Sequence, residues 1–497
     1  MDKTTPATST TAPDYEVLVV GSGFAGLCMG ARLKRAGIER FAILEKDDQL
    51  GGTWRVNDYP GAACDVPSHL YSFSFAQNAQ WSRKFPSQQE LWAYTQSVAK
   101  EFGLLAHIKL SCGMLGADFD EAAGLWNVRT PQGRLSAKFL VTCIGALGRP
   151  SIPDIPGLST FEGTIFHSSR WDHRYDYRNQ RVAVIGTGAS AIQIVPELAK
   201  EVAHLDLFQR TAPWVLPRPD RRITAPEKWL MQHLKPLQSL YRLKTYVQYE
   251  ARALVFVYQP KLRALAQRQA LAHLKRQIPD DALRVKVTPN FAIGCKRVLL
   301  MNDYYPALTR SNVSVVTEGI REVRPHSIVT HSGEEKPVDA IVLGTGFDVQ
   351  HAMGAVCVRG RGGVSLLDVN EGGGLEAYKG CAVAGFPNYF MITGPNTGLG
   401  HNSMIYMIES GVSYVLDAIK KQRAPQWHSV EVKAQVQAAY NADIQQRLKG
   451  TVWASGCKSW YLDHTGKNTT LWPGFTFIYR WITRRFDEQN YTVRKIR

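Results

Sequence analysis

Two glycine-rich segments constrain the fold of this chain more than any other feature. The first, Gly21-Ser-Gly23-Phe-Ala-Gly26, follows the short apolar run 15–20, and the second, Gly186-Thr-Gly188-Ala-Ser-Ala191, follows the run 181–185. A strand, a G-x-G-x-x-G/A turn and a helix in this order predict a dinucleotide site, because the glycines let the backbone and the helix N-terminus approach a pyrophosphate. We therefore expect an α/β chain with two Rossmann-like dinucleotide-binding domains. The first cofactor should contact Gly21, Ser22, Gly23, Phe24, Ala25 and Gly26.

A charged residue ends the second predicted strand of each unit. Glu45 follows the run 41–44 and Arg210 follows the run 205–208, and each lies 24 residues after the first glycine of its own motif. A carboxylate accepts hydrogen bonds from a ribose diol and repels a 2′-phosphate, whereas a guanidinium binds that phosphate. The first site therefore suits FAD or NAD, and the second site should take NADP.

Two irregular loops are candidates to contact a flat cofactor ring. The first runs from Gly51 through Tyr59-Pro60-Gly61 to Asp65, and its glycines and proline exclude a regular element. Asp65 is either a surface residue or a carboxylate placed against a cation. The second loop, 394–400, connects a predicted strand over 387–393 to a predicted helix over 401–420, whose N-terminus suits an anionic ring. We expect Asn396 in this loop to contact the cofactor.

Two apolar runs that end in glycine, 139–144 and 338–343, indicate where the chain leaves the first domain and returns to it. They divide the chain into a disordered tail over 1–14, a first dinucleotide domain over 15–148 plus 346–497, a second over 149–218 plus 297–345, and a helical insertion over 219–296. The insertion carries an apolar stripe near helical spacing, which we expect to pack into the core. The stripe consists of Trp229, Leu230, Leu234, Leu237, Leu240, Tyr241 and Leu243.

The net charge of +16 is concentrated in one segment. Between Arg210 and Arg297, 18 Lys+Arg stand against 5 Asp+Glu. No nucleic-acid motif accompanies this charge, so we expect no nucleic-acid partner. A solvated helical face is the simplest interpretation, and attraction to anionic lipid or to the phosphates of NADPH is the alternative. No apolar run reaches the roughly 18 residues that cross a bilayer, so we expect no transmembrane segment.

The eight cysteines are scattered and form no C-x-x-C pair. This spacing argues against a redox disulfide and against a thiolate metal site, so we expect no metal. It also favours a reducing, cytoplasmic location.

Two longer patterns resemble the fingerprints of Baeyer–Villiger monooxygenases. One is Phe161-x-Gly163-x-x-x-His167-x-x-x-Trp171-Asp172, between the two glycine motifs, and the other is the loop from Gly51 to Asp65. The resemblance covers nearly the whole chain beyond residue 14. It implies an enzyme that uses FAD, NADPH and O2 to insert an oxygen atom next to a ketone carbonyl, giving an ester or lactone. The loops 394–402 and 468–474 depart from the better-known members, which leaves the size and shape of the substrate open.

The resemblance also implies roles for single residues. Arg297 corresponds to the family's catalytic arginine, which stabilises an anionic peroxide of the reduced flavin, and Asp65 corresponds to its partner. Lys296 would hold the 2′-phosphate with Arg210 and Thr211, and Trp460 would lie near NADP. His167 and Trp171 lie four residues apart, so on a helical turn they would share a face. They either pack the linker or couple the position of the NADP domain to oxygenation. Further contacts to FAD are expected from Gly52, Thr53, Trp54, Asp65 and Tyr71, and to the NADP pyrophosphate from Thr187, Gly188, Ala189, Ser190, Ala191 and Gln193.

Three other functions compete with this interpretation. A related flavin-containing monooxygenase would oxidise sulfur or nitrogen of lipophilic substrates with the same fold and cofactors. A pyridine-nucleotide disulfide reductase would need a C-x-x-C or C-x-x-x-x-C pair, which the chain lacks. A basic binding protein without catalysis would not need two intact dinucleotide motifs.

Overall fold

The computed structural model describes residues 12–349, 357–371, 374–424 and 426–495, and within them two sheets each carry one glycine motif. The larger sheet has the order β17-β4-β5-β6-β1-β2-β3, with β18 paired to β6. Its strands are β1 (Tyr15–Val20), β2 (Phe41–Leu44), β3 (Ile108–Lys109), β4 (Gly116–Asp120), β5 (Leu125–Thr130), β6 (Gly133–Thr142), β17 (Cys357–Arg359) and β18 (Tyr389–Met391). Pairings among β3, β2, β1, β6 and β18 are parallel, while β4-β5 and β5-β6 are antiparallel. The sheet therefore combines a Rossmann-like core with a meander.

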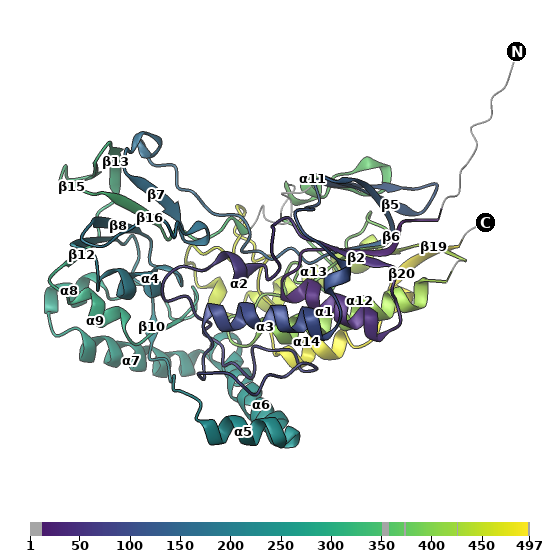
Figure 1. The fold of residues 1–497 in the computed structure, drawn as a ribbon, viewed down its shortest axis with the longest axis horizontal. Helices are drawn as coiled ribbons and strands as arrows, with labels where there is room; N and C mark the ends of the chain where they lie inside the picture. Colours follow the sequence, from purple (N-terminus) through teal and green to yellow (C-terminus); the bar gives the residue numbers. More distant parts are fainter. Residues whose placement is uncertain (1–11, 350–356, 372–373, 425, 496–497) are drawn as a thin grey trace, which may run out of the picture.

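The second sheet is parallel throughout and has the order β12-β9-β8-β16-β7. Its strands are β7 (Thr164–His167), β8 (Arg181–Ile185), β9 (His204–Phe208), β12 (Val313–Val316) and β16 (Ala340–Leu343). Smaller sheets are formed by β10 (Val215–Leu216) with β11 (Leu299–Leu300), by β13 (Ile320–Arg324), β14 (Ser327–Thr330) and β15 (Glu335–Pro337), and by β19 (Trp427–Val432) with β20 (Tyr491–Lys495). Figure 1 shows the two main sheets in separate lobes. The predicted fold class, α/β with two Rossmann-like domains, is confirmed.

Helices cover both sheets and form the insertion. The first lobe carries α1 (Phe24–Arg35), α2 (Thr53–Val56), α3 (Gln88–Glu101), α11 (Leu366–Glu371), α12 (Met404–Gln422), α13 (Ala434–Leu448) and α14 (Thr476–Ile482). The second lobe carries α4 (Ala191–Leu198) and α9 (Tyr304–Leu308), and the insertion carries α5 (Ala225–His233), α6 (Lys235–Glu250), α7 (Pro260–Gln277) and α8 (Asp281–Lys286). Each glycine motif leads from a strand into a helix, β1 into α1 and β8 into α4. None of the helices in the described ranges is long and apolar enough to cross a membrane.

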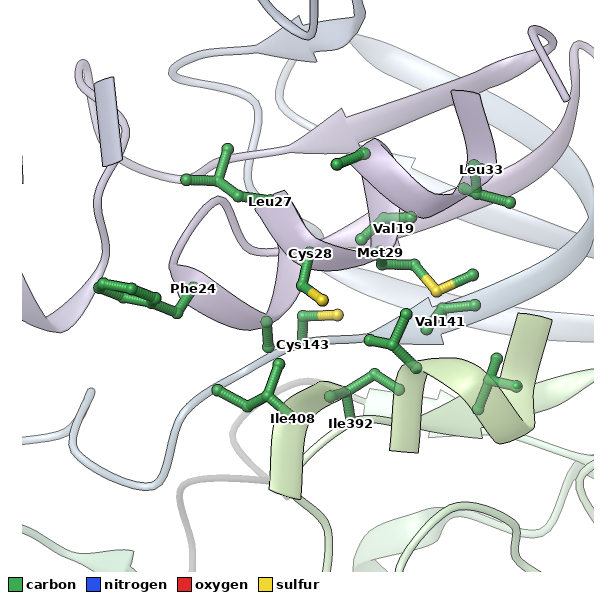
Figure 2. Packing of buried hydrophobic residues seen from close by; sticks show 14 of the residues in the cluster. Val19, Phe24, Leu27, Cys28, Met29, Leu33, Val141, Cys143, Ile392 and Ile408 are labelled. Carbon is green, nitrogen blue, oxygen red and sulfur yellow. The ribbon is translucent and has the colours of Figure 1, made fainter. Parts of the chain in front are cut away.

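The core of the first lobe lies where α1 meets β6 and α12. Figure 2 shows Cys28 of α1 and Cys143, just after β6, with their sulfur atoms toward each other beside Ile392 and Ile408. Both cysteines are buried and free, and burial raises the pKa of each thiol. Because a protonated thiol is a poor nucleophile, this pair acts as packing material for the Rossmann-like core.

The apolar stripe of the insertion is not in the core, which corrects our expectation. Trp229, Leu230, Leu234, Leu240 and Leu243 are exposed. The reason lies in what α6 packs against: the 69–72 segment offers backbone carbonyls, and Arg242 donates hydrogen bonds to those of His69 and Ser72 at 2.6 and 2.8 Å. Helical spacing predicted the stripe but not the side of the helix that would be covered.

Two further differences concern the termini and the cysteines. Cys295 and Cys457, 162 residues apart, form a disulfide that links the end of the insertion to the C-terminal segment. Their spacing resembles no redox motif, so the sequence did not indicate this pairing. Of the predicted tail, residues 1–11 lie outside the described residues, and Asp14 accepts a hydrogen bond from the amide of Ser136 at 2.8 Å.

Candidate active site between two dinucleotide-binding loops

The first glycine turn is built for close backbone approach. A Cβ at Gly26 would overlap the carbonyl oxygen of Gly21, so α1 can pack on its strand only with glycine at this position. Glu45 follows β2 and is buried, and its Oε2 accepts hydrogen bonds from the amide and hydroxyl of Ser22 at 2.9 and 2.6 Å. The carboxylate is thus held beside the turn, where it can meet a ribose diol. These residues fit an adenine dinucleotide without a 2′-phosphate.

The loop after this turn supplies aromatic side chains. Thr53 and Trp54 begin α2, and Nε1 of Trp54 donates to the hydroxyl of Tyr71 at 3.2 Å. The ring of Tyr71 also meets that of Phe24 in the first turn of α1, with centroids 5.4 Å apart. The structure therefore brings four of the predicted FAD contacts, Phe24, Thr53, Trp54 and Tyr71, next to the glycine turn.

Arg297 and Asp65 form a bidentate ion pair across 232 residues of sequence. Nη2 of Arg297 lies 2.8 and 2.6 Å from the two carboxylate oxygens, and Nε lies 3.2 Å from Oδ2. Burial by itself would raise the pKa of Asp65, but the guanidinium outweighs it and the net pKa is lowered. Asp65 in turn raises the pKa of Arg297. The alternative that Asp65 is only a surface carboxylate is thereby excluded.

The guanidinium keeps an open side after pairing. The side chain of Arg297 is 40% exposed and that of Asp65 is 26% exposed. The hydrogen bonds of the guanidinium run through Nε and Nη2, and Nη1 of Arg297 has no partner among the described residues. Nearby Tyr59 and Tyr461 have pKa values raised to about 12 by burial, so neither phenol is a base at neutral pH. Arg297 is therefore a permanent cation in a fixed orientation, with a free hydrogen-bond donor at Nη1.

The second glycine turn lies beside two cations. A Cβ at Gly188 would meet nothing within 4 Å, so the space next to this turn is open to a pyrophosphate. Burial lowers the pKa of Lys296, and the charge of Arg210 lowers it further, which places these two residues within electrostatic reach of each other. In the part of the chain that the structure describes, neither has a carboxylate within ion-pair distance. The hydroxyl of Thr187 donates to the carbonyl of Thr211 at 2.8 Å and fixes the loop that carries Arg210. Two adjacent unpaired cations fit a 2′-phosphate.

Gln193 has a structural role besides its predicted contact with NADP, which stays a prediction. Its Nε2 donates to the carbonyl of Ala63 at 2.9 Å, and its Oε1 accepts from the hydroxyl of Tyr59 at 3.0 Å. A Cβ on Gly61 would come within 2.7 Å of the backbone oxygen of Gln193. The amide of Gln193 is therefore committed to joining α4 to the fingerprint loop of the other lobe. This joint brings the two dinucleotide loops together.

His167 and Trp171 do not share a helical face, which corrects the prediction for this pair. His167 ends β7 and a short 3-10 turn separates it from Trp171. Burial lowers the pKa of His167; its Nε2 donates to the carbonyl of Gly346 at 2.9 Å, and its Nδ1 accepts from the amide of Ser169 at 3.1 Å. Trp171 instead packs edge-on against Phe166 with centroids 4.7 Å apart. His167 thus ties the fingerprint to the point where the chain returns to the first lobe, and Trp171 fills the second core.

Asn396 and Trp460 lie in the C-terminal part of the site. Nδ2 of Asn396 donates to the carbonyls of Asn468 and Leu471 at 2.8 and 3.0 Å, so this amide nitrogen stabilises a loop, and a contact of Asn396 with the cofactor stays a prediction. Trp460 is exposed and packs against Tyr461, whose pKa responds to Arg297. Trp460 is thus adjacent to a tyrosine near Arg297, and its expected position near NADP stays a prediction.

Sequence reasoning missed Glu250. This carboxylate at the end of α6 is buried and accepts hydrogen bonds from Asn402, which precedes α12, and from the hydroxyl of Thr476, which begins α14. It connects the insertion to the 394–402 loop. Glu250 is the only acid between Glu227 and Asp280 in a basic segment, and this isolation was the available signal.

Comparisons with known proteins agree with this geometry. Residues 18–255 match the family model described as pyridine nucleotide-disulphide oxidoreductase. The chain is 48% identical over 490 residues to a Baeyer–Villiger monooxygenase of Pseudomonas aeruginosa, covering 98% of this chain and 93% of that protein. It is 46% identical over 479 residues to a Baeyer–Villiger monooxygenase of Streptomyces coelicolor, covering 96% of this chain and 92% of that protein.

Solved structures of similar proteins extend the likeness to the whole fold. A steroid monooxygenase bound to NADP superposes with a TM-score of 0.86 at 29% identity, covering 97% of this chain and 100% of that one. Cyclohexanone monooxygenase from Rhodococcus sp. Phi1 bound to NADP+ superposes with a TM-score of 0.85 at 26% identity, covering 97% and 99%. The fingerprints, the paired glycine motifs and the near full-length relatives agree, and this chain belongs to the Baeyer–Villiger monooxygenase family.

Proposed function

We propose that this protein inserts one oxygen atom of O2 next to the carbonyl of a ketone, giving an ester or a lactone, with consumption of NADPH. The observation that supports this function most is the Arg297–Asp65 pair, a fixed cation with an open donor beside the joint of the two dinucleotide loops. Oxygen insertion into a ketone passes through negatively charged oxygen, and a preorganised guanidinium stabilises such charge.

The enzyme is an NADPH-dependent flavoprotein monooxygenase, with FAD at the first glycine turn and NADP at the second. When bound, NADPH supplies the hydride and reduced FAD supplies the activated oxygen. Glu45 would hold the ribose of FAD, and Arg210 with Lys296 would hold the 2′-phosphate of NADP. The Gln193–Tyr59 contact sets the distance between the two sites.

Arg297 would act on the substrate and on charged oxygen, and Asp65 would act on Arg297. Since the pKa of Arg297 is raised, the guanidinium keeps its proton throughout the reaction. Asp65 fixes its orientation, so that Nη1 points its free donor away from the pair. His167 would transmit the position of the second lobe to the crossing at Gly346. A cytoplasmic location stays a prediction.

Variants of the ion pair test this function. In Arg297→Ala the stabilisation of negative oxygen is lost, and removal of one such donor costs about 10²–10³ in rate. Flavin reduction requires no cation at this point. We expect Arg297→Ala to bind FAD, to be reduced by NADPH and to form almost no ester, and Asp65→Ala to be impaired in both steps. Stopped-flow spectroscopy measures reduction, and product analysis by gas chromatography measures ester.

Arg297→Lys is the matched control, because it keeps a charge but cannot pair bidentately. It should restore part of the ester yield lost in Arg297→Ala. Ester formation by Arg297→Ala at a near-native rate would remove the proposed role of the guanidinium. If the intact protein accepts no ketone and sulfides are oxidised, sulfur or nitrogen oxidation would be favoured instead.

A further inference from the structure

The insertion helix α6 exposes large aliphatic side chains although it has a buried side. The buried side carries a nearly buried amide and hydroxyl, Gln238 (1% exposed) and Thr245 (4% exposed), together with the ring of Tyr249. The exposed side carries Leu240 (61% exposed), Leu243 (55%) and Val247 (55%), interspersed with polar residues that include two lysines. A helix on the surface of a soluble domain normally turns its large aliphatic residues toward the core. The exposed side of α6 therefore combines apolar groups with cations.

The preceding helix extends this apolar surface. Trp229 is 61% exposed and stacks on His233, with ring centroids 4.6 Å apart. Figure 1 shows α5 and α6 projecting together at the lower edge of the molecule, away from both sheets. We call this surface the insertion face and define it by Trp229, Leu230, Leu234, Leu240, Leu243 and Val247. Several large exposed apolar groups on two protruding helices indicate an interaction surface.

The charge around the insertion face is mainly positive, and Glu227 at the start of α5 is paired with Arg221. From Lys228 to Pro279 the chain contains ten Lys+Arg and one acid, Glu250, which is buried and hydrogen-bonded inside the molecule. Lys235 and Lys244 are exposed on α6 itself. A second copy of this chain docked on the same face would bring these cations against each other. An anionic surface would instead complement them.

We propose that the insertion face binds the surface of an anionic phospholipid bilayer. The apolar side chains enter the boundary between headgroups and acyl chains, and Trp229 lies at headgroup depth, where an amphipathic ring is favoured. Lys235 and Lys244 reach the lipid phosphates while their aliphatic stems cover apolar surface. Such binding requires neither FAD nor substrate, so it is independent of the reaction proposed above.

Vesicle co-sedimentation of the FAD-loaded protein tests this inference. The probes are vesicles of phosphatidylcholine alone and of phosphatidylcholine with phosphatidylglycerol, each at low and high salt. We expect binding to the anionic vesicles at low salt, weaker binding at high salt because surface charges are screened, and little binding to neutral vesicles. The triple variant Leu240→Gln, Leu243→Gln, Val247→Gln and the double variant Lys235→Glu, Lys244→Glu should each bind at least about tenfold more weakly.

Matched controls change the same residue types elsewhere. Leu105, Leu115 and Ile152 are exposed to a similar degree outside the insertion, so their triple change to Gln should leave binding intact. Lys420→Glu with Lys449→Glu controls for the change in net charge. Retained NADPH-driven flavin reduction shows that each variant is folded.

Three results would overturn the inference: no sedimentation with anionic vesicles at low salt, equal binding by the insertion-face variants, or equal binding to neutral vesicles. Sedimentation velocity without lipid distinguishes a bilayer from a second copy of this chain as the occupant of the insertion face. If the intact protein self-associates and the triple insertion-face variant does not, a second copy of the chain occupies the insertion face. This result would also overturn the inference that the face binds a bilayer.

Discussion

Glu45 and Arg210 occupy equivalent places in two copies of one structural unit, and the sign of their charges separates the two sites. Glu45 is buried and engaged by Ser22, so an additional phosphate there would meet an uncompensated anion. Arg210 is exposed. The pKa of Lys296 is lowered mainly by burial and further by the nearby charge of Arg210. Removing either cation should therefore weaken binding of a 2′-phosphate and leave the rest of the dinucleotide site unchanged.

The intact enzyme should prefer NADPH over NADH by at least about tenfold, or roughly 1.4 kcal/mol. Arg210→Ala should raise the KM for NADPH and leave that for NADH nearly unchanged, as measured by steady-state oxidation of each nucleotide. Arg310→Ala, a change of an exposed arginine on the same lobe, is the control. Equal use of both nucleotides by the intact protein would contradict the assignment of Arg210.

The contact of a side chain could be predicted from the sequence where its partner is another side chain in a recognisable motif. It could not be predicted where the partner is a backbone atom distant in the sequence. The Arg297–Asp65 pair could be expected because both positions match a family pattern, and the two side chains do pair. Gln193 and Asn396 also bind carbonyls of loops that the sequence does not place, and these bonds were not predicted, whereas their contacts with cofactors stay predictions. No local sequence pattern predicts which backbone carbonyls lack a backbone hydrogen-bond donor in the folded protein.

At the level of the element, the sequence predicted where most strands lie. The runs 15–20 and 41–44 coincide with β1 and β2, and the run 338–343 contains β16. These strands are buried on both faces, so they read as continuous apolar runs. The helical character of the insertion that contains α6 was predicted, but the burial of its apolar stripe was predicted wrongly, because hydrophobic periodicity gives an apolar side and contains no information about what covers it.

The loop before α12 carries a buried histidine that makes stability depend on pH. The pKa of His401 is lowered from its ordinary 6.5 to about 4, mainly by burial and to a lesser extent by the charge of Arg252. The unfolded chain therefore binds a proton between pH 6.5 and 4 that the folded chain does not bind, and the stabilisation present above pH 6.5 is lost as the pH falls. The slope is about 1.4 kcal/mol per pH unit for each such group. His69, whose pKa is also about 4, contributes in the same direction.

Thermal unfolding of the intact protein should shift to lower temperature between pH 7 and pH 5, and the shift should be smaller in His401→Gln. Scanning calorimetry at fixed FAD concentration measures both midpoints. His464→Gln, which changes an exposed histidine, should behave as the intact protein. An unchanged pH dependence in His401→Gln would show that folding does not lower the pKa of this imidazole.

At the scale of the whole molecule, the disulfide between Cys295 and Cys457 closes a long loop around the active site. Cys295 lies two residues before Arg297, and Cys457 lies three before Trp460. The cross-link holds the segment that carries Arg297 against the C-terminal segment. Constraint of an unfolded chain over 162 residues gives an upper stabilisation of about 5 kcal/mol.

Cys457→Ser should therefore unfold at lower urea concentration than the intact protein under non-reducing conditions, and a reductant should lower the intact protein to the level of the variant. Cys357→Ser, which changes a half-buried free thiol, is the control. Equal urea midpoints for intact protein and Cys457→Ser without reductant would show that the bond does not form in solution.

The fold as a whole follows from repetition, but the active site depends on how the repeats meet. Two copies of the strand–turn–helix unit are visible in the sequence because each is local. Their relative placement depends on contacts such as Tyr59 with Gln193 and His167 with Gly346, which join segments more than 130 residues apart. The position of Arg297 against Asp65 is a product of that placement.

Isotope labelling of the product tests the central claim most directly. The FAD-loaded enzyme is incubated with NADPH, ¹⁸O2 and a panel of cyclic and open-chain ketones, and products are identified by mass spectrometry alongside NADPH consumption. The account predicts an ester or lactone with one ¹⁸O atom in the inserted position and one NADPH oxidised per ester. Oxidation of NADPH that yields only hydrogen peroxide with every ketone, while sulfides or amines are oxygenated, would contradict it.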